Sequence, residues 1–385
     1  MKKALLVTTV CGFVPQFEMN NVKILQEMGY EIHYASNFDN PVYKIPMDIF
    51  ERVGIIKHQV DFVRSPYSNK NLKVYHQLRQ VIYNEKFDLI HCHTPMASVI
   101  TRIATRKLLN HGTKLIYTAH GFHFYKGAPK HNWLFYYPME YLLARWTDVL
   151  ITINNEDFKN ASRFKLHNKG KLYKVNGVGI KELSISEHKV NDIRQRYKLK
   201  NTDFCIISVG ELSKRKNQMI VIKAIEELHD SHVKYLICGS GNKEKEIKEY
   251  IRNRNLDNQV FLLGYQQDVK NLLKQADCFV HSALQEGLSM AVMEAMDSGV
   301  PVICSDIRGN NDLITNGVEG LLVKHNDAKE YASCIKKLRN DRKLSMQFTV
   351  RAQKKIQQYR ITVVEKQMRE IYMSLDMSKQ LRLKE

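Results

Sequence analysis

The chain has 385 residues, 44% of them hydrophobic, and its 59 Lys and Arg against 40 Asp and Glu give a formal net charge of +19. A chain of this length exceeds what one hydrophobic core ordinarily serves, so two domains are expected. No apolar run of about eighteen residues occurs, and the start passes directly into a strand pattern, which argues against a membrane-spanning helix and a secretory leader.

The cysteines and the positive charge narrow the expected setting of the protein. None of the seven cysteines belongs to a C-x-x-C pair and most lie in apolar runs, as is typical of reduced, buried thiols in a cytoplasmic protein. The charge favours an anionic partner, which on charge alone is a nucleic acid, an anionic lipid or a nucleotide diphosphate. Because aromatic residues do not alternate with the basic ones, nucleic-acid binding is not expected.

Apolar, β-branched runs alternate with longer helical patterns in two series along the chain. The alternation predicts an α/β protein with two parallel sheets, each covered by helices. A polar stretch over residues 181–201 separates the series, so we predict domains of residues 1–185 and 186–385, with the last helix able to pack back on the first domain. The predicted strands are residues 4–10, 31–35, 89–93, 115–119 and 149–153, then 204–209, 235–238, 260–263, 278–281 and 302–304.

Ligands of open parallel sheets bind beyond the carboxyl ends of the strands, so the loops there are the candidate sites. In the first half, VCGFVPQFE places Gly12 in the first such loop, without the glycine triplet of a dinucleotide site. IHCHTP puts His91 and His93 one residue apart, but no companion carboxylates stand nearby and no metal site is predicted. TAHGFHF places His120 where it either hydrogen-bonds a substrate or is tied to nearby backbone.

Basic residues bunch in the first strand-to-helix loop of the second half, VGELSKRKNQ. Gly210 turns the chain there, and Lys214, Arg215 and Lys216 stand just ahead of a helix predicted to begin near Asn217. Three cations at such a turn suit a diphosphate that leaves with developing negative charge, and the alternative is a solvated basic turn. The next such loop, CGSGN, lacks the full G-x-G-x-x-G pattern of a nicotinamide-dinucleotide site.

The stretch QEGLSMAVMEAMDSGVPV has a glutamate on either side of a helix start. Ser289 is predicted to cap a short helix over residues 290–298, whose free amides and dipole form an anion site. Gly287 lets the backbone approach a phosphate, and Glu286 stands just outside the helix, where it can bind sugar hydroxyls. Glu294, about one turn inside, can face the same pocket. The alternative is that both glutamates are solvated.

Taken together these motifs resemble the retaining glycosyltransferases of the GT-B fold, glycosyltransferase family 4. The resemblance covers essentially the whole chain, with DLIHCHTP, TAHGFHF and TDVLITINNEDF in the first half and VGELSKRKN, ICGSG, FLLGYQQDV and EGLSMAVME in the expected order in the second. It implies a GT-B fold, in which two Rossmann-like domains with parallel sheets face an interdomain cleft. The first domain would bind the acceptor and the second the nucleotide sugar.

The resemblance also implies roles for the loop residues. Glu286 would hold the hydroxyls of the donor sugar, Glu294 would bind the ribose, and His120 would reach the donor sugar from the first domain. Lys216 and the amides of the glycine loop would bind the diphosphate, and residues 264–269 would flank the base. The catalytic group is then Glu286, His120 and Lys216, and the ligand-binding group is Glu294, Gly287, Leu288, Ser289, Lys214, Arg215, Gly210, Gly264, Tyr265, Val269 and Gly12.

Two positions depart from the family pattern. Glu211 stands where many members have an arginine directly after the glycine of the phosphate loop, and Lys214 or Arg215 is expected to supply the missing cation. Ser289 stands where many relatives have a second glycine, a change that leaves its backbone amide available.

The expected function is transfer of a hexose or N-acetylhexosamine, with retention, from a nucleotide diphosphate sugar to a glycan or polyprenyl-diphosphate-linked acceptor in capsule or exopolysaccharide synthesis. The co-substrate is expected to be UDP-linked, with no other cofactor. No metal is expected, because no D-x-D pair is placed to hold one. A nucleotide-sugar 2-epimerase of the same fold and a non-catalytic protein that binds anionic surfaces stay open as alternatives.

The basic charge also predicts where the enzyme works. Each Lys or Arg near an anionic membrane contributes about 1 kcal/mol, so we expect a cytoplasmic protein in peripheral contact with the inner face of the cell membrane. Residues 132–146, NWLFYYPMEYLLARW, either touch lipid or form a helix that packs on the first sheet.

Overall fold

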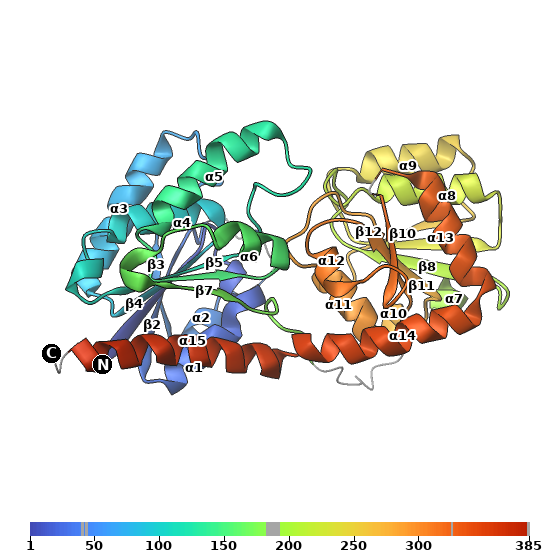
Figure 1. Ribbon diagram of the computed structural model, residues 1–385. Coiled ribbons are helices and arrows are strands. Elements are labelled where there is room, and N and C mark those ends of the chain that lie inside the picture. Colours follow the sequence, from blue (N-terminus) through green and yellow to red (C-terminus); the bar gives the residue numbers. More distant parts are fainter. Residues whose placement is uncertain (40–41, 43–44, 182–192, 325, 383–385) are drawn as a thin grey trace. The chain divides into compact units, whose positions relative to one another are not determined.

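A computed structural model describes residues 1–39, 42, 45–181, 193–324 and 326–382, with side chains described as far as residue 375 (Figure 1). The chain divides into two compact units, Met1–Gly179 with Ile361–Glu385, and Ile180–Arg360. The predicted boundary at 185/186 lies outside the described residues, and the C-terminal residues belong to the first unit. The interdomain cleft stays a prediction.

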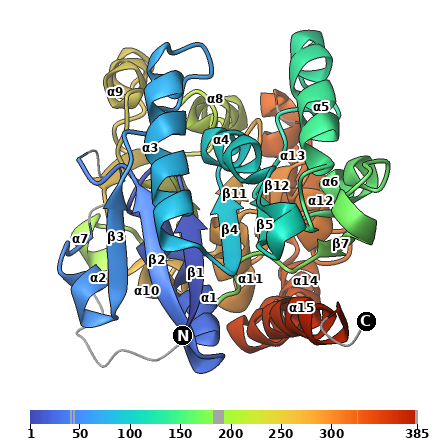
Figure 2. The ribbon, with the colours of Figure 1, turned by 90° about the vertical axis from the view of Figure 1, so that its left-hand side faces the viewer.

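The first unit is built on a seven-stranded, all-parallel sheet of order β3-β2-β1-β4-β5-β6-β7, whose strands lie side by side in Figure 2. Its strands are β1 Lys2–Val7, β2 Tyr30–Ser36, β3 Ile55–Gln59, β4 Leu89–His93, β5 Lys114–Ala119, β6 Val149–Thr152 and β7 Lys171–Lys174. Its helices are η1 Val14–Glu18, α1 Met19–Glu27, α2 Ile49–Arg52, α3 Lys70–Glu85, α4 Pro95–Thr105, η2 Leu109–His111, α5 Lys130–Ala144, α6 Asn155–Ala161, η3 His167–Lys169 and α15 Ile361–Arg382.

Helices cover both faces of this sheet, so its central strands are buried on both sides. Helices α3, α4 and α5 lie on one face, and α1 and α15 lie on the other (Figure 1). Strand β4, LIHCH, is buried over its whole length. Because side chains alternate along a strand, Ile90 and Cys92 join the core under α3 and α4, while His91 and His93 point to the opposite layer.

The second unit is built on a six-stranded parallel sheet of order β10-β9-β8-β11-β12-β13. Its strands are β8 Phe204–Val209, β9 Val233–Cys238, β10 Val260–Gly264, β11 Cys278–His281, β12 Val302–Ser305 and β13 Gly320–Val323. Its helices are α7 Ile193–Arg196, α8 Gln218–Leu228, α9 Glu244–Asn253, α10 Val269–Leu273, α11 Met290–Asp297, α12 Asn310–Leu313, α13 Ala328–Asn340, α14 Arg342–Ile356 and η4 Gln357–Tyr359.

Two apolar layers sandwich the second sheet. Ile206 and Cys278 pack under α8, α9 and α13, while their chain neighbours Ile207 and Phe279 pack under α11 and α14, as the alternation of a strand requires. The strand order reverses between the neighbours β8 and β11, and likewise between β1 and β4 in the first unit. In sheets of this kind ligands bind at the carboxyl ends of the strands beside such a reversal, so each unit has its own candidate region, at the ends of β1 and β4 in the first and of β8 and β11 in the second.

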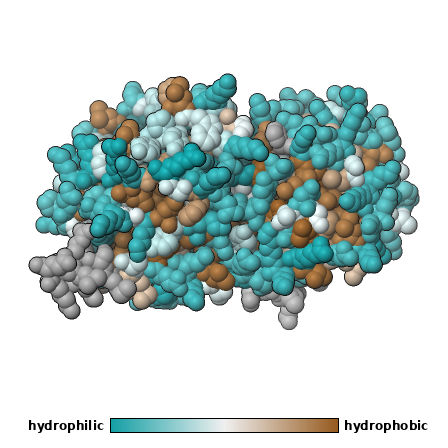
Figure 3. All heavy atoms as spheres, viewed as in Figure 1, coloured by the Kyte–Doolittle hydropathy of each residue, from teal (hydrophilic) through white to brown (hydrophobic). Residues whose placement is uncertain are grey.

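Surface and thiols agree with a globular α/β protein. The face seen in Figure 3 is mostly hydrophilic, with apolar groups scattered over it. All seven cysteines are free thiols, and all but Cys334 are buried. Among the described helices none is both long and apolar enough to cross a membrane.

Candidate functional site

In the second unit, the loops that follow β8 and β11 are tied together. The backbone N–H of Leu284 donates to the carbonyl of Arg215 at 2.8 Å. The hydroxyl of Ser282 donates to the carbonyls of Lys216 and Asn217 at 3.1 and 3.0 Å. These bonds hold the basic turn directly against the loop that carries Glu286.

Glu286 is a nearly buried carboxylate next to two cations and an imidazole. Its Oε1 lies 2.6 Å from Nζ of Lys216, 3.1 Å from the guanidinium of Arg215 and 3.4 Å from Nε2 of His281, and 10% of its side chain is exposed. Burial acts to raise the pKa of this carboxyl, but the charge of Lys216 and the contacts with His281 and Arg215 outweigh it and hold the pKa below its ordinary value. Glu286 is therefore ionised at neutral pH.

Ser289 begins the helix α11, as the sequence predicts. Its hydroxyl accepts a hydrogen bond from the backbone N–H of Val292 at 3.4 Å and lies 3.2 Å from Nε2 of His281. The predicted cap is thus confirmed, and it brings in His281, the last residue of β11. No role for His281 could be predicted, because in the sequence it is only the end of an apolar strand.

Glycines let the neighbouring loops touch backbone to backbone. Gly239 and Gly241 follow β9, and an added Cβ would stand 1.9 Å from the carbonyl oxygen of Gly210 and 2.3 Å from that of Leu212, respectively. Gly239 also has φ +143°, a conformation that L side chains rarely adopt. The ICGSG motif therefore serves the close packing of two strand-end loops in this chain.

A cavity of ≈ 510 Å³ opens at the carboxyl ends of β8, β9 and β10. Glu294 lines it from α11, and burial raises the pKa of its carboxyl, with Lys270 opposing and Asp297 adding to the shift. Its described lining residues include neither Glu286 nor Lys216, so the two glutamates of the motif serve different parts of the loop cluster. The lining is Val209, Gly210, Glu211, Cys238, Gly239, Ser240, Tyr265, Gln266, Gln267, Asp268, Val269, Lys270 and Glu294.

The other predicted residues of the second unit lie around these two places. Arg215 contacts Glu286, whereas Lys214 is exposed beside it. Leu288 packs against the apolar layer under α11 and α14. Gly287 lies against Gly309, and a Cβ added to Gly309 would stand 2.5 Å from the carbonyl oxygen of Gly287. Gly264 ends β10, and its carbonyl accepts from Gly239 at 2.8 Å.

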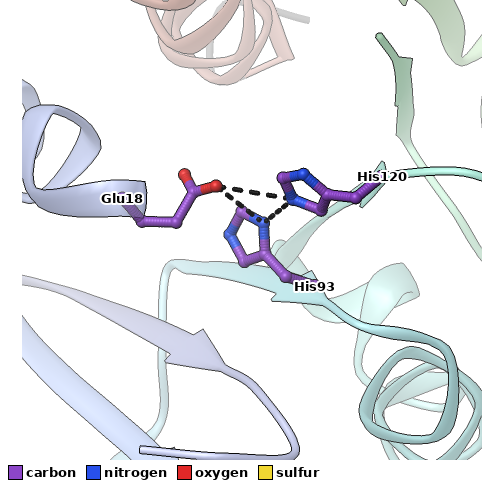
Figure 4. Close-up of side chains that lie close together, drawn as sticks. All are labelled: Glu18, His93 and His120. Carbon is purple, nitrogen blue, oxygen red and sulfur yellow. Dashed lines mark hydrogen bonds and ion pairs between the residues drawn. The ribbon is translucent and has the colours of Figure 1, made fainter. Parts of the chain in front are cut away.

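In the first unit, three side chains converge at the carboxyl edge of the sheet (Figure 4). Glu18 points from the end of η1 toward His93, the last residue of β4, and His120, which follows β5. Its Oε1 lies 3.5 Å from Nδ1 of His93 and 3.4 Å from Nε2 of His120, and these two nitrogens are 3.1 Å apart. Predicted Gly12 lies in the loop before η1, where its carbonyl accepts from Gln16 at 3.2 Å.

Within the described residues no Lys or Arg forms an ion pair with this cluster, and burial is the main cause of its pKa shifts. Burial raises the pKa of Glu18 to about 8, against an opposing hydrogen bond from Asn21. Burial lowers the pKa of His120 to about 4 and, with the neighbouring imidazoles, that of His93 well below its ordinary value. Both imidazoles are therefore neutral at pH 7. The sequence missed Glu18 because its partners follow strands far along the chain.

His91, the other histidine of the IHCHTP motif, has separate partners. Its Nδ1 lies 2.9 Å from the hydroxyl of Tyr372 on α15, and its Nε2 lies 2.8 Å from the hydroxyl of Thr118. These bonds attach the C-terminal helix to the central strand β4. His91 and His93 thus do not act as a pair.

Two family models match this chain. Residues 20–169 match the model described as Glycosyltransferase Family 4, and residues 189–355 match the one described as Glycosyl transferases group 1. The two matched segments cover most of the first and the second unit, respectively.

Relatives of known name match over most of the chain. A Bacillus subtilis protein named as a glycosyltransferase, EpsD, is 35% identical over 342 residues, which are 88% of this chain and 87% of that protein. The UDP-Gal:alpha-D-GlcNAc-diphosphoundecaprenol alpha-1,3-galactosyltransferase of Escherichia coli is 29% identical over 284 residues, 72% of this chain and 73% of that enzyme.

Among solved structures, Anabaena HepE in complex with UDP matches with a TM-score of 0.76 at 19% identity, over 97% of this chain and 100% of that one. Sucrose-phosphate synthase of Thermosynechococcus elongatus matches with a TM-score of 0.78 at 15% identity, over 98% of this chain and 100% of that one. At these identities the likeness establishes the fold, two Rossmann-like domains of the GT-B type.

Proposed function

The chain belongs to the glycosyltransferases of the group 1 and family 4 type, and we propose that it moves a hexose or N-acetylhexosamine from a UDP-linked sugar to a glycan or lipid-linked sugar acceptor, with retention of configuration. The observation that carries this proposal is the Glu286 cluster of the second unit. A buried, ionised carboxylate and two cations stand at one strand end, near a cavity that Glu294 lines.

The cavity and the Glu286 cluster are suited to the two ends of a nucleotide sugar, the nucleoside and the sugar. The cavity of ≈ 510 Å³ lies within the range of about 300–1,000 Å³ that small-molecule sites occupy, and Tyr265 and Val269 at its rim offer apolar surface to a base. Glu294 is placed to accept hydrogen bonds from ribose hydroxyls. Glu286 would accept bonds from sugar hydroxyls, and the amides that begin α11 would bind the diphosphate.

In the proposed reaction, the bond between the anomeric carbon and the diphosphate oxygen breaks, and the diphosphate leaves with its electron pair. Lys216 and the start of α11 stabilise the negative charge that develops on the leaving group. The acceptor hydroxyl attacks the same face of the sugar, and its proton passes to the leaving phosphate. His120 would approach the sugar from the first unit.

The names of relatives support the choice of UDP and of a lipid-linked acceptor. The Escherichia coli enzyme is named for UDP-Gal and a diphosphoundecaprenol acceptor, and HepE has been solved with UDP-glucose. A Campylobacter jejuni relative, 29% identical over 143 residues, is also named for a diphospho-undecaprenol acceptor. For this chain we propose the same classes of donor and acceptor, in cell-surface polysaccharide synthesis.

We also propose peripheral contact with an anionic membrane. On α5, Leu134, Phe135 and Leu142 are 69%, 61% and 54% exposed, while Leu143 and Ala144 pack into the core. Of the two predicted alternatives for residues 132–146, the structure has the packed helix, and the exposed apolar side chains of α5 support the proposal of lipid contact. With the net charge of +19, these side chains would lie on the inner face of the cell membrane.

A thermal-shift panel of UDP, GDP, ADP and their sugars tests the proposal. A ligand at a hundred times its dissociation constant adds about 2.7 kcal/mol of apparent stability, so UDP and one UDP-sugar should raise the melting temperature. Glu294→Ala and Lys216→Ala should lose the shift, and Lys223→Ala, an exposed lysine on α8, should keep it. A panel without any shift at millimolar ligand would contradict the donor site.

A further inference from the structure

The three ligand-type atoms of the first unit stand at nearly equal separations. Glu18 Oε1, His93 Nδ1 and His120 Nε2 are 3.1, 3.4 and 3.5 Å apart. A tetrahedral zinc ion holds nitrogen and oxygen ligands at about 2.0–2.2 Å, which places neighbouring ligand atoms about 3.3–3.5 Å from each other. The three atoms therefore match one face of a tetrahedral coordination shell.

The chemistry of the three groups matches the geometry. Two imidazoles and a carboxylate form a ligand set of zinc sites that keep a position open for water or substrate. Glu18 and His93 are 3% and 0% exposed, and the ion-pair partners of Glu18 in the described chain are the two histidines. Buried ionised carboxylates are ordinarily paired or coordinate a metal, and a divalent cation would let Glu18 bind in its ionised form.

Surrounding residues support this arrangement. Asn21 donates its side-chain amide to Oε2 of Glu18, which leaves Oε1 for the ion. The ring of Phe13 packs 5.0 Å from that of His120 and 5.9 Å from that of His93 and shields one side. On another side Glu18, Asn21 and His120 border a cavity of ≈ 20 Å³, which is room for one water molecule.

A second cluster in the first unit, His33, His58 and Glu85, has a similar set of side chains but different partners. His33 Nδ1 lies 2.8 Å from Nε2 of His58, and its Nε2 lies 2.8 Å from Oε1 of Glu31. Glu85 lies 2.6 Å from Nζ of Lys3. Each group has a close partner of its own, and the carboxylate already has a cation.

We propose that Glu18, His93 and His120 bind one divalent transition-metal ion of the zinc type, with its fourth position open toward the small cavity. This site goes beyond the proposed sugar transfer and uses residues of the first unit alone. Because Nε2 of His120 would be a ligand, Nδ1 is the ring nitrogen that would be left to contact the donor sugar.

Direct metal binding tests the site without any activity. The full chain is stripped with a chelator, equilibrated with Zn²⁺, desalted and assayed for metal, and Co²⁺ replaces Zn²⁺ for visible absorption. We expect one equivalent of Zn²⁺ per chain and the intense absorption of tetrahedral Co²⁺. Glu18→Gln and His93→Gln should lose both signals, and His58→Gln, from the second cluster, should keep them.

A variant at Asn21, which hydrogen-bonds Glu18, distinguishes loss of metal binding from misfolding. Asn21→Ala leaves all three ligands in place, and loss of such a partner typically weakens metal affinity about 10–100-fold. Competition with a chromophoric chelator measures this change, and circular dichroism checks the fold of each variant. No retained metal in the wild type, or equal retention in the wild type and in Glu18→Gln, would overturn the proposal, whatever the donor panel shows.

Discussion

Glu18 and Glu286 are two glutamates in equivalent places, each at the carboxyl edge of a parallel sheet and each nearly buried, with 3% and 10% of the side chain exposed. Their pKa values move in opposite directions. Burial raises that of Glu18 to about 8, whereas that of Glu286 lies below its ordinary value despite its burial. The difference lies in the neighbours, which are neutral imidazoles in one unit and Lys216 with Arg215 in the other.

The comparison shows that countercharge, not burial, sets the charge of a strand-end carboxylate in this fold. The edge of the second unit holds a fixed negative group together with two cations, as a site for a polar and anionic ligand needs. At the edge of the first unit the Glu18 carboxyl is mostly neutral at pH 7 and both imidazoles are neutral, so a metal ion that binds there would displace the proton of Glu18.

Removing the cation nearest to Glu286 should have the largest effect. Lys216→Ala deletes the proposed leaving-group stabiliser, so the transfer rate should fall about 10²–10³-fold. It also breaks a nearly buried ion pair, which should lower the free energy of unfolding by about 3 kcal/mol, with Arg215 limiting the loss. Transfer of radiolabelled sugar and chemical denaturation measure the two effects. Lys223→Ala is the matched control, and equal behaviour of the two variants would contradict the assignment.

Neutralising the two glutamates tests the comparison itself. Glu286→Gln leaves two cations without a carboxylate and should cost about 2–3 kcal/mol at pH 7. In the chelator-treated protein, Glu18→Gln should cost less than about 0.5 kcal/mol, because a carboxyl with a pKa of about 8 is mostly neutral already. Urea unfolding of both variants gives the values. A larger loss for Glu18→Gln than for Glu286→Gln would refute the role given to countercharge.

The central strands could be predicted because they are buried and mostly apolar, and the edge strands could not. Sequence patterns find β1, β2, β4, β5 and β6 but miss β3 and β7, whose side chains are largely exposed or half-buried. They also miss β13, which has only four residues and begins at a glycine. The predicted strand 4–10 ends at Val7 instead, since Thr8 donates to the carbonyl of Val10 at 2.8 Å and turns the chain.

The candidate site could be predicted wherever one loop carries its own chemistry. The basic turn at residues 214–216 is one unbroken stretch of sequence, and so is EGLSMAVME at residues 286–294. The structure brings Lys216, Arg215 and Glu286 together. The Glu18 cluster could not be predicted, because its three residues lie at or after the ends of three different strands. The IHCHTP motif suggests His91 as the partner of His93, but the two histidines have different partners in the structure. The carboxylate beside His93 is that of Glu18, which follows β1.

A hydrogen bond between His91 and Tyr372 attaches the C-terminal helix α15 to the first sheet. Tyr372→Phe removes the hydroxyl that lies 2.9 Å from Nδ1 of His91 and leaves a buried ring nitrogen without its partner. This should lower the free energy of unfolding by about 1–3 kcal/mol. Met373→Ala, at a neighbouring position that is 49% exposed, should change it by less than about 0.5 kcal/mol. Thermal denaturation of both variants decides whether this bond contributes.

Glu294 should give the smallest effect, visible only as a pH dependence. Burial raises the pKa of its carboxyl above the ordinary 4.5, and the ionised form is the one that accepts bonds from ribose hydroxyls. As the pH falls, a growing share of the free protein must lose a proton before it binds, so UDP affinity should begin to fall at a higher pH than an ordinary glutamate would cause, by at most about tenfold per pH unit.

Glu294→Gln isolates this effect, since the titration of the phosphates is common to both proteins and cancels in the ratio of their affinities. Calorimetry between about pH 7.5 and 5 should show the advantage of the wild type over the variant shrinking as the pH falls. A ratio that stays constant would mean that Glu294 does not bind UDP as a carboxylate. The donor site would then depend on the Glu286 cluster alone, where the pKa lies too low to titrate in this range.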